Sequence, residues 1–531
     1  MKYVEGFNRN QAVLFPQCID DIIPPDAEVR VIEAFVESLP LKELGFHNHQ
    51  PRDEGRPMYH PKDLLKLYIY GYLNRVRSSR HLEKECERNI ELIWLLKGLR
   101  PCFRTIAGFR SEHPEVFRNT FRHFVGLLNK NGFLGRKTVA IDGSKFRAVN
   151  SKKNNFNQKK IKRQLTYIDE KISQYLTQLD KGDLSESEII KVDQKISGHR
   201  KQKRKYKRLE KQLKESGMEQ ISTTDVDARS MVVHGQVVEV CFNVQTVVDD
   251  KHNLVVEYQP TNRNDKKALL FMAKRARQAM KVNTITALAD KGYHNGEQLH
   301  SCAEEGIITY VAVPDPPRNS TVPTADYYGE KFRYNKKKDT FTCPMGQTLK
   351  SNGQWYDRKY DEYITRIKHY RTFKCKTCPA RLQCTSNEQG RILERSEYAE
   401  AAEKNTRRVR KNPSIYSARQ QIIEHVFGTI KRQWGYDHIL LKGLRKNDGE
   451  FGLIYLVYNF RRIINILGVD AVKILLKKAD FWFSTIWRSI EGHDQKVKLF
   501  FKAVIAQTTG CIKIITVSFC TNCRYEQMND L

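Results

Sequence analysis

The sequence lacks an apolar run long enough to span a bilayer without interruption. Its most apolar late stretch, from Leu499 to Cys520, contains Lys502 and Lys513, which a membrane-spanning helix does not readily tolerate. The opening residues, MKYVEGFNRNQAV, also lack the continuous apolar core of a secretory signal. We therefore expect a cytoplasmic protein with no membrane segment.

Acidic residues are scarce relative to basic ones. Lys and Arg number 92 against 61 Asp and Glu, so the formal net charge is +31 over 531 residues. Because a cationic protein releases counterions when it binds a polyanion, this excess favours nucleic acid as the partner. The alternative is a basic protein whose charge serves solubility alone. With 40% hydrophobic residues, a chain of this length can form a substantial core and several structural units.

The 12 cysteines do not suggest a disulfide framework, because thiols stay reduced in the cytoplasm. Four of them occur in one region, as Cys343, Cys375, Cys378 and Cys384. The Cys-x-x-Cys spacing of Cys375 and Cys378 is typical of zinc sites. We interpret the four as ligands of a structural Zn²⁺, with four free thiols in a loop as the alternative.

Apolar residues recur at helical spacing between about residues 61 and 130. The predicted helices begin at Pro61, near Ser79, after Thr105 and at Pro114. Short helices with arginines near their ends suit a helix-turn-helix-like DNA reader, so we name Arg80, Arg104 and Arg110 as candidate DNA contacts. An ordinary helical bundle with a solvated basic surface is the alternative.

Two short apolar runs each end in an acidic residue followed closely by glycine. The run TVAI precedes Asp142-Gly143, and ITALA precedes Asp290-Lys291-Gly292. Both are predicted to be buried strands with a carboxylate at the tip, although Asp-Gly after a strand is also a common turn signal. Further strands are predicted within residues 231–261 and 308–314, and helices from about Asp265 to Met280 and from about Ser417 to Trp434. This order indicates a mixed α/β core with helices packed on a sheet.

A long helical insertion separates the first strand from the second strand-rich block. Apolar residues from Ile161 to Leu179 follow a heptad seam, and Ser185 with Glu188 forms a capping-box pattern that starts a return helix after a turn near Gly182. We predict an antiparallel helical hairpin. Residues 151–217 contain 19 Lys and Arg against 9 Asp and Glu. The hairpin could lie on DNA phosphates, or its charges could form a solvated face.

Five ordered segments of the sequence resemble the successive motifs of DDE transposases of bacterial insertion sequences. They are GRPMYHPKDLLKLYIYGYLNRVRSSRHLEKEC, TVAIDGSKFRAVNS, TTDVDARSM with CFNVQTVVDD, LADKGYHN, and RQQIIEHVFGTIKRQWGYDHILLKGLRKNDGEF. The resemblance runs from about residue 10 to residue 468. It implies a ribonuclease-H-like catalytic core in which Asp142, Asp290 and Glu424 are the three catalytic acids. It also implies cleavage at element ends and strand transfer in a complex that contains more than one transposase.

The three acids fit the chemistry that the resemblance implies. Carboxylates suit Mg²⁺ or Mn²⁺, and two such ions can drive in-line attack on a phosphodiester. Lys431 and Arg432 lie about two helical turns beyond Glu424, where they could reach the DNA backbone. Asp225 and Asp227 are further acids near a strand, and we leave them outside the triad with their role open.

The expected partners are DNA, as terminal inverted repeats and target, and other copies of the chain. Alternatives are a catalytically silent DNA-binding regulator derived from a transposase, and a metal-dependent nuclease of the same fold. The expected domains are a helical DNA-binding domain (1–130), the first part of the catalytic core (131–150 and 218–340), the basic hairpin (151–217), a cysteine-cluster insertion resembling a zinc ribbon (341–400), the final helix region of the core (401–468) and a tail of unknown role (469–531).

Overall fold

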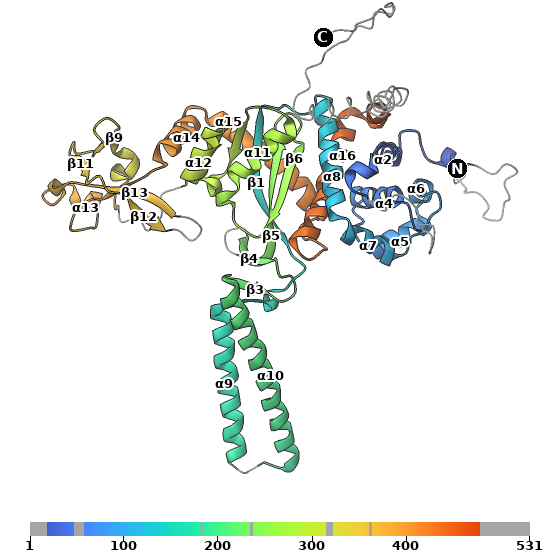
Figure 1. Cartoon of the computed structure of the whole chain (residues 1–531), viewed down its shortest axis with the longest axis horizontal. Helices are drawn as coiled ribbons and strands as arrows, with labels where there is room; N and C mark the ends of the chain where they lie inside the picture. Colours follow the sequence, from blue (N-terminus) through green and yellow to red (C-terminus); the bar gives the residue numbers. More distant parts are fainter. Residues whose placement is uncertain are drawn as a thin grey trace, which may run out of the picture.

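The computed structural model describes residues 18–46, 58–181, 184–233, 237–314, 322–359 and 364–477. The predicted turn at Gly182 and the apolar stretch from Leu499 to Cys520 lie outside these ranges, as does most of the tail. Figure 1 shows a central α/β body with a helical domain on one side, a small β-rich unit on the other and a long helical hairpin projecting from it.

The N-terminal part of the described chain is all helical, as the sequence predicts. Its helices are α1 (Ile19–Ile22), α2 (Glu28–Glu37), α3 (Leu41–Leu44), α4 (Pro61–Leu73), α5 (Ser79–Arg88), α6 (Ile90–Leu95), α7 (Phe103–Glu112) and α8 (Pro114–Lys130). Pro61 and Pro114 each occupy the first turn of their helix, where a missing N–H costs nothing. Ser78 rather than Ser79 is the N-cap residue of α5.

The central sheet is mixed. Its strands are β1 (Thr138–Arg147), β4 (Arg229–Val233), β5 (Val237–Asp249), β6 (Val255–Thr261), β7 (Thr286–Ala289) and β8 (Ile308–Val311). Strand β5 runs antiparallel to β1, and β4 and β6 both pair with β5. On the other side, β1, β7 and β8 are parallel neighbours. The parallel pairing of β1 with β7 ends at Ile141 and Ala289, directly before the predicted acids Asp142 and Asp290. Asp142 was predicted at the tip of its strand, but β1 continues to Arg147 because it stays paired with β5 beyond that point.

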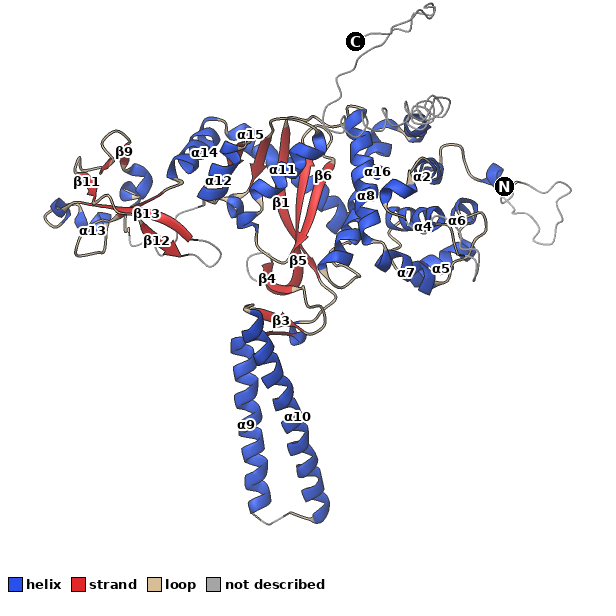
Figure 2. Ribbon diagram, in the orientation of Figure 1, coloured by secondary structure: helices blue, strands red, loops and turns tan. Residues whose placement is uncertain are grey.

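Helices cover the sheet (Figure 2). They are α11 (Leu269–Met280), α12 (Gly296–Glu304), α14 (Ala399–Lys411), α15 (Pro413–Phe427) and α16 (Leu444–Leu467). Two predicted helices differ from the observed ones. Asp265 lies in a separate 3₁₀ turn, η2 (Asp265–Lys267), because its side chain is held by buried amides of β5. The predicted helix from Ser417 starts earlier, at Pro413, and ends in a π-helical segment, η7 (Gly428–Gln433).

The predicted hairpin is confirmed. Its helices are α9 (Gln158–Asp180) and α10 (Glu186–Ser216), and its base is a small antiparallel sheet of β2 (Asn155–Asn157) and β3 (Gln220–Ser222). A 3₁₀ turn, η1 (Lys152–Asn154), joins this base to β1. The capping box of Ser185 and Glu188 forms at the start of α10. Figure 1 shows the hairpin extending away from the sheet.

A second, wholly antiparallel sheet follows β8. It consists of β9 (Arg333–Asn335), β10 (Thr340–Thr342), β11 (Thr348–Ser351), β12 (Tyr356–Lys359), β13 (Ile364–Arg371) and β14 (Leu393–Ser396), with α13 (Arg381–Cys384) beside it. This unit has its own small core, which includes Phe332, Phe341 and Tyr370. Cys343 and Cys384 pack against that core.

One large hydrophobic core joins the N-terminal helices to the central sheet. It extends from Ile23 in the helical domain to Leu476, and α16 packs against α4, α8 and β6. The helical domain and the α/β body are therefore a single packed unit. Within the described ranges, no helix combines the length and the apolar character needed to cross a membrane.

Candidate active site

Two of the three predicted acids are brought together by neighbouring parallel strands. Ile141 of β1 pairs with Ala289 of β7, and each is followed directly by an aspartate, Asp142 and Asp290. The two carboxylates therefore leave the same edge of the sheet from adjacent positions. The charge of Asp290 is close enough to raise the pKa of Asp142.

Asp142 lies in an environment that disfavours its charged form. Its pKa is raised to about 7, mainly by burial and in smaller part by the charges of the neighbouring Asp290 and Asp265. Arg419 of α15 opposes this effect, with its Nη1 atom 3.4 Å from Oδ2 of Asp142. A carboxylate that is buried beside other carboxylates gains most from a bound cation, because the cation removes both the repulsion and the desolvation penalty.

Asp265 is a third acid at this edge that the sequence analysis did not identify. Its Oδ1 atom accepts hydrogen bonds from Asn243 Nδ2 (2.7 Å) and Gln245 Nε2 (2.6 Å), both on β5. Gln245 in turn accepts a bond from the buried hydroxyl of Tyr293. Burial raises the pKa of Tyr293, and the charges of Asp265, Asp142 and Asp290 raise it further. The charges of all three aspartates therefore act on the hydroxyl group of Tyr293.

Gly143 allows this close approach. An ideal Cβ atom on Gly143 would lie 2.2 Å from Oδ1 of Asp265 and 2.7 Å from Nε2 of Gln245. Any side chain there would push Asp265 away from β1. The carbonyl oxygen of the Asn243 side chain is buried at the same place, and it has no hydrogen-bond partner in the described structure. The signal in the sequence was the glycine itself, which we interpreted only as part of a strand-end turn.

Glu424 lies on α15 but does not join the aspartates. Its side chain is exposed, and its Oε1 atom accepts a hydrogen bond from Gln420 Nε2 (2.7 Å). Arg419, which contacts Asp142, is five positions earlier, and five helical steps rotate a side chain by about 140°. In the described structure, the side chain of α15 that contacts Asp142 is therefore that of Arg419, and the bond given for Glu424 is to Gln420. Its catalytic role stays a prediction.

Lys431 and Arg432 lie in η7, beyond Glu424, and differ in exposure. The ammonium group of Lys431 donates to the carbonyl oxygen of Lys145 (2.6 Å) and lies over the ring of Phe146. Burial lowers the pKa of Lys431 to about 8. Arg432 is exposed. Lys431 thus fastens η7 to β1, and Arg432 is the one of the two that faces solvent.

The three arginines predicted to contact DNA in the helical domain also differ. Arg80 and Arg104 are exposed, and both guanidinium groups lie over the ring of Phe103. Arg110 is buried and donates to the hydroxyl of Tyr72 and to the carbonyl oxygen of Arg77. Because the guanidinium group of Arg110 is buried and hydrogen-bonded within the helical domain, Arg110 has a role in packing.

Asp225 and Asp227 have a structural role that their sequence position did not reveal. Asp225 accepts from the backbone N–H of Gly443, and Asp227 accepts from that of Leu444 (2.8 Å). These groups begin α16, where unpaired N–H groups need acceptors. The two acids therefore anchor the start of α16 and are not part of the strand-end group.

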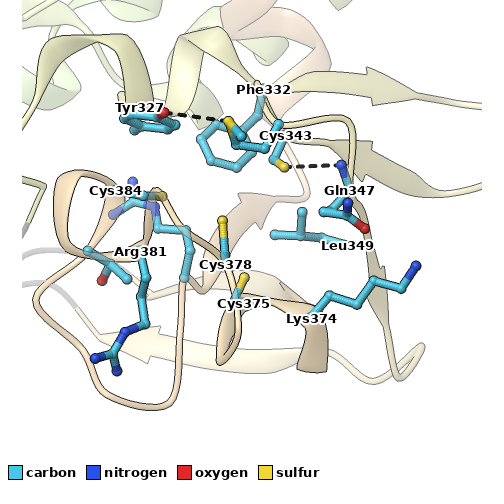
Figure 3. Close-up of a pocket in the computed structure, with 13 residues that line it drawn as sticks. Tyr327, Phe332, Cys343, Gln347, Leu349, Lys374, Cys375, Cys378, Arg381 and Cys384 are labelled. Carbon is cyan, nitrogen blue, oxygen red and sulfur yellow. Dashed lines mark hydrogen bonds between the residues drawn. The ribbon is translucent and has the colours of Figure 1, made fainter.

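The four predicted zinc ligands line one small cavity (Figure 3). The cavity has a volume of about 30 Å³, the scale of a single small occupant. Sγ of Cys343 accepts from the backbone N–H of Gln347 (3.2 Å). Burial raises the pKa of Cys384, and the other three thiols raise it further. Gly390, with φ of +95°, packs against Cys375, where a Cβ atom would come within 2.4 Å of the Cβ of that cysteine.

Neither the aspartates at the sheet edge nor the four cysteines form a complete metal site. Within the described residues, no three His, Cys, Asp or Glu side chains stand close enough together to hold an ion. The strand-end aspartates still fit a hard cation by their oxygen donors and mutual repulsion, and the four thiols fit a soft one by their shared cavity.

The mixed sheet, in which the parallel pairing of β1 with β7 stops just before Asp142 and Asp290 and helix α15 packs against both strands, is consistent with a ribonuclease-H-like fold. Two family profiles match the chain: one described as a transposase domain (DUF772) over residues 17–112, the other as a transposase DDE domain over residues 342–464. Both matches support the resemblance to DDE-type transposases of insertion sequences. No curated protein and no solved structure matches it significantly.

The two matched regions lie on either side of the segment that contains the aspartates and include only part of the predicted site. The first covers Arg80, Arg104 and Arg110, and the second covers the four cysteines together with Glu424. Asp142, Asp290 and the hairpin lie between them. The family generally uses divalent metal ions and binds DNA.

Proposed function

We propose that this transposase binds the ends of its element, cleaves DNA phosphodiesters there and joins the freed strands to target DNA as an oligomer. The observation that carries the proposal is the pairing of Ile141 with Ala289, which sets Asp142 and Asp290 side by side at one sheet edge. Neighbouring carboxylates that are partly buried repel each other, so their proximity does not by itself stabilise the fold.

Mg²⁺ or Mn²⁺ would be held by Asp142 and Asp290, with Glu424 as the third ligand. When bound, such an ion would supply Lewis-acid stabilisation of charge on the phosphodiester oxygens. The chain's own contribution is to fix the two aspartates on strands and to hold Asp265 against Gly143 with Asn243 and Gln245. Glu424 would reach this edge only if α15 rotates or its side chain swings on DNA binding.

Asp142→Asn tests the proposal. The substitution keeps the shape of the side chain but removes a negative ligand, so we expect cleavage and strand joining to fall to background while binding of element ends is kept. A gel assay with labelled end DNA that scores nicking and joining separately measures both. Full cleavage by this variant would refute the assignment.

A DNA-binding regulator without catalysis is the second candidate, and the position of Glu424 is the observation that favours it. Glu424 is exposed and bonded to Gln420, and Arg419 takes the place beside Asp142. The same assay separates the candidates, because a regulator binds end DNA and neither nicks nor joins it. A nuclease of the same fold would nick without joining.

We also propose that Cys343, Cys375, Cys378 and Cys384 hold a structural Zn²⁺ when it is bound. Support comes from their shared cavity and from the packing of two of them against the core of the second sheet. Zinc there would fasten α13 and the turn at Cys375 to strands β10 and β11, in a unit otherwise held by few buried residues.

A further inference from the structure

The charge of the hairpin is segregated along its length. We define its root half as residues 158–168 of α9 and 200–216 of α10, and its tip half as residues 169–180 and 186–199. The root half contains 13 Lys and Arg against 2 Asp and Glu, whereas the tip half contains 3 against 6. The basic excess of the insertion is therefore confined to the end nearest the sheet.

Contacts between the two helices show that these halves are also structural units. Ile161 of α9 packs with Leu209 and Leu213 of α10 in the small core of the root. At the boundary, Lys203 pairs with Asp169. Beyond it, Tyr175 stacks on His199 in the tip. The two helices therefore contact each other in both halves, and the basic segments of α9 and α10 lie at the same end of the hairpin.

Most root cations are not used within the protein. In the described structure, the root cations that form ion pairs are Lys203, Lys211 and Lys214. The others include Lys201, Arg204 and Arg208, which are exposed. Their spacing of three and four residues places them on one outward face of α10. From Arg200 to Arg208 this stretch of α10 is about 12 Å long.

This concentration of charge works against the helix. Like charges three or four positions apart destabilise a helix by about 0.2–0.5 kcal/mol per pair. Between Lys195 and Leu209 no acid offsets them. A face that served only solubility would mix the two signs, as the tip half does. The nearly unmixed basic charge of the root half is expected for a surface whose neutralising charges belong to a bound molecule.

The root also adjoins the edge that carries the aspartates. Beyond Asp142, β1 continues to its end at Arg147, and five residues later η1 begins and leads into the root. A cavity of about 430 Å³ opens there, lined among others by Arg147, Lys152 and His438. Figure 1 shows the root directly beneath the sheet and the tip far from it.

We propose that the outward face of the root half is a sequence-independent binding surface for the phosphate backbone of duplex DNA, and that the tip half takes no part in it. The inference rests on the proposed function only for its partner, DNA. B-DNA carries one phosphate charge per about 1.7 Å of axis, so a row of this length spans many phosphates. The surface would hold flanking DNA beside the catalytic edge irrespective of its sequence.

The test compares two triple variants of the full chain with the same change in net charge. One replaces three exposed root cations, Lys201→Gln, Arg204→Gln and Arg208→Gln. The other replaces three exposed lysines at the far end of the hairpin, Lys191→Gln and Lys195→Gln in the tip half and Lys181→Gln directly after α9. Binding to a labelled duplex unrelated to any element end is measured by fluorescence anisotropy at several salt concentrations, with chelator present to prevent cleavage. Circular dichroism checks that both variants keep their helical content.

We expect the root variant to bind the duplex more weakly and to lower the slope of log affinity against log salt by about 2 to 3, since each phosphate contact contributes about 0.9. The tip variant should keep the wild-type slope. An unchanged slope in the root variant, or an equal loss in the tip variant, overturns the inference. Wild-type protein that binds no duplex overturns it together with the proposed function, whereas Asp142→Asn, which leaves the hairpin intact, separates binding from cleavage.

Discussion

At the scale of single residues, the arrangement around Asp142 depends on the absence of a side chain at position 143. Gly143 of β1 pairs with Gln245 of β5, and polar atoms of Asp265 and Gln245 fill the space where its Cβ would be. Asp265, Asn243 and Gln245 then form one hydrogen-bonded group behind the aspartates. Small residues next to catalytic acids are often assigned to turns, but here the glycine is required by close packing.

Gly143→Ala adds only one methyl group, but it should impair the site strongly. The new Cβ would displace Asp265 from its amide partners, which leaves buried polar groups unsatisfied and costs about 1–3 kcal/mol in unfolding free energy. We expect cleavage to fall with stability. Chemical denaturation and the end-cleavage assay measure the two effects.

Gly126→Ala is the matched control. Gly126 lies in the middle of α8 with no atom near its ideal Cβ position. Alanine there should stabilise the protein by about 0.5–1 kcal/mol through its helix propensity. A Gly143→Ala protein as stable and active as the control would show that the contact with Asp265 has no importance.

At the scale of elements, the second sheet is the unit that a metal ion would affect most. Its own core consists of five buried residues, fewer than an independent unit of this size normally needs. The four thiols gather at one end of that core, between β10, β11 and α13. The stability of this unit should therefore depend on what the thiols bind.

Metal analysis of the purified protein should find about one zinc ion per chain, and Cys375→Ser with Cys378→Ser should lose it, because thiolates supply the ligands. Limited proteolysis should then cut the second sheet while the central body stays intact. Cys102→Ser, which alters an exposed thiol of the helical domain, should keep its zinc. Zinc-free wild-type protein, or equal loss in the Cys102→Ser control, would contradict the assignment.

At the scale of the whole molecule, a buried glutamate connects the helical domain to the central α/β body. Glu450 of α16 is fully buried, accepts from the backbone N–H groups of Leu440 and Leu441, and meets Tyr72 and Arg77 of the helical domain. The shared hydrophobic core runs through the same contact. DNA held by the helical domain would thus be held rigidly relative to the sheet edge.

Glu450→Ala should lower the free energy of unfolding by about 3–5 kcal/mol, because Arg77 would stay buried without its partner. Both regions should melt in one transition, since they share a core. Calorimetry measures both quantities. Glu115→Ala removes an exposed ion pair with Arg445 between the same regions and should cost less than about 1 kcal/mol. Equal losses of unfolding free energy in the two variants would show that the buried contact of Glu450 contributes no more than an exposed ion pair.

The sequence by itself determined the local elements and their order. Proline, capping residues and apolar periodicity are local signals, so the helices at Pro61 and Pro114, the hairpin and the strands before Asp142 and Asp290 could all be predicted. The family resemblance came from the same short motifs. These signals involve residues only a few positions apart, which is why they can be read without the fold.

Only the tertiary structure decided which distant residues share a site. It placed Asp265 beside Asp142, buried Arg110, turned Asp225 and Asp227 towards α16, and left Glu424 exposed on its helix. Sheet register and helix rotation fix these outcomes, and both depend on packing between segments separated by more than a hundred residues. Burial and the meeting of charges are properties of that packing, and no local pattern encodes them.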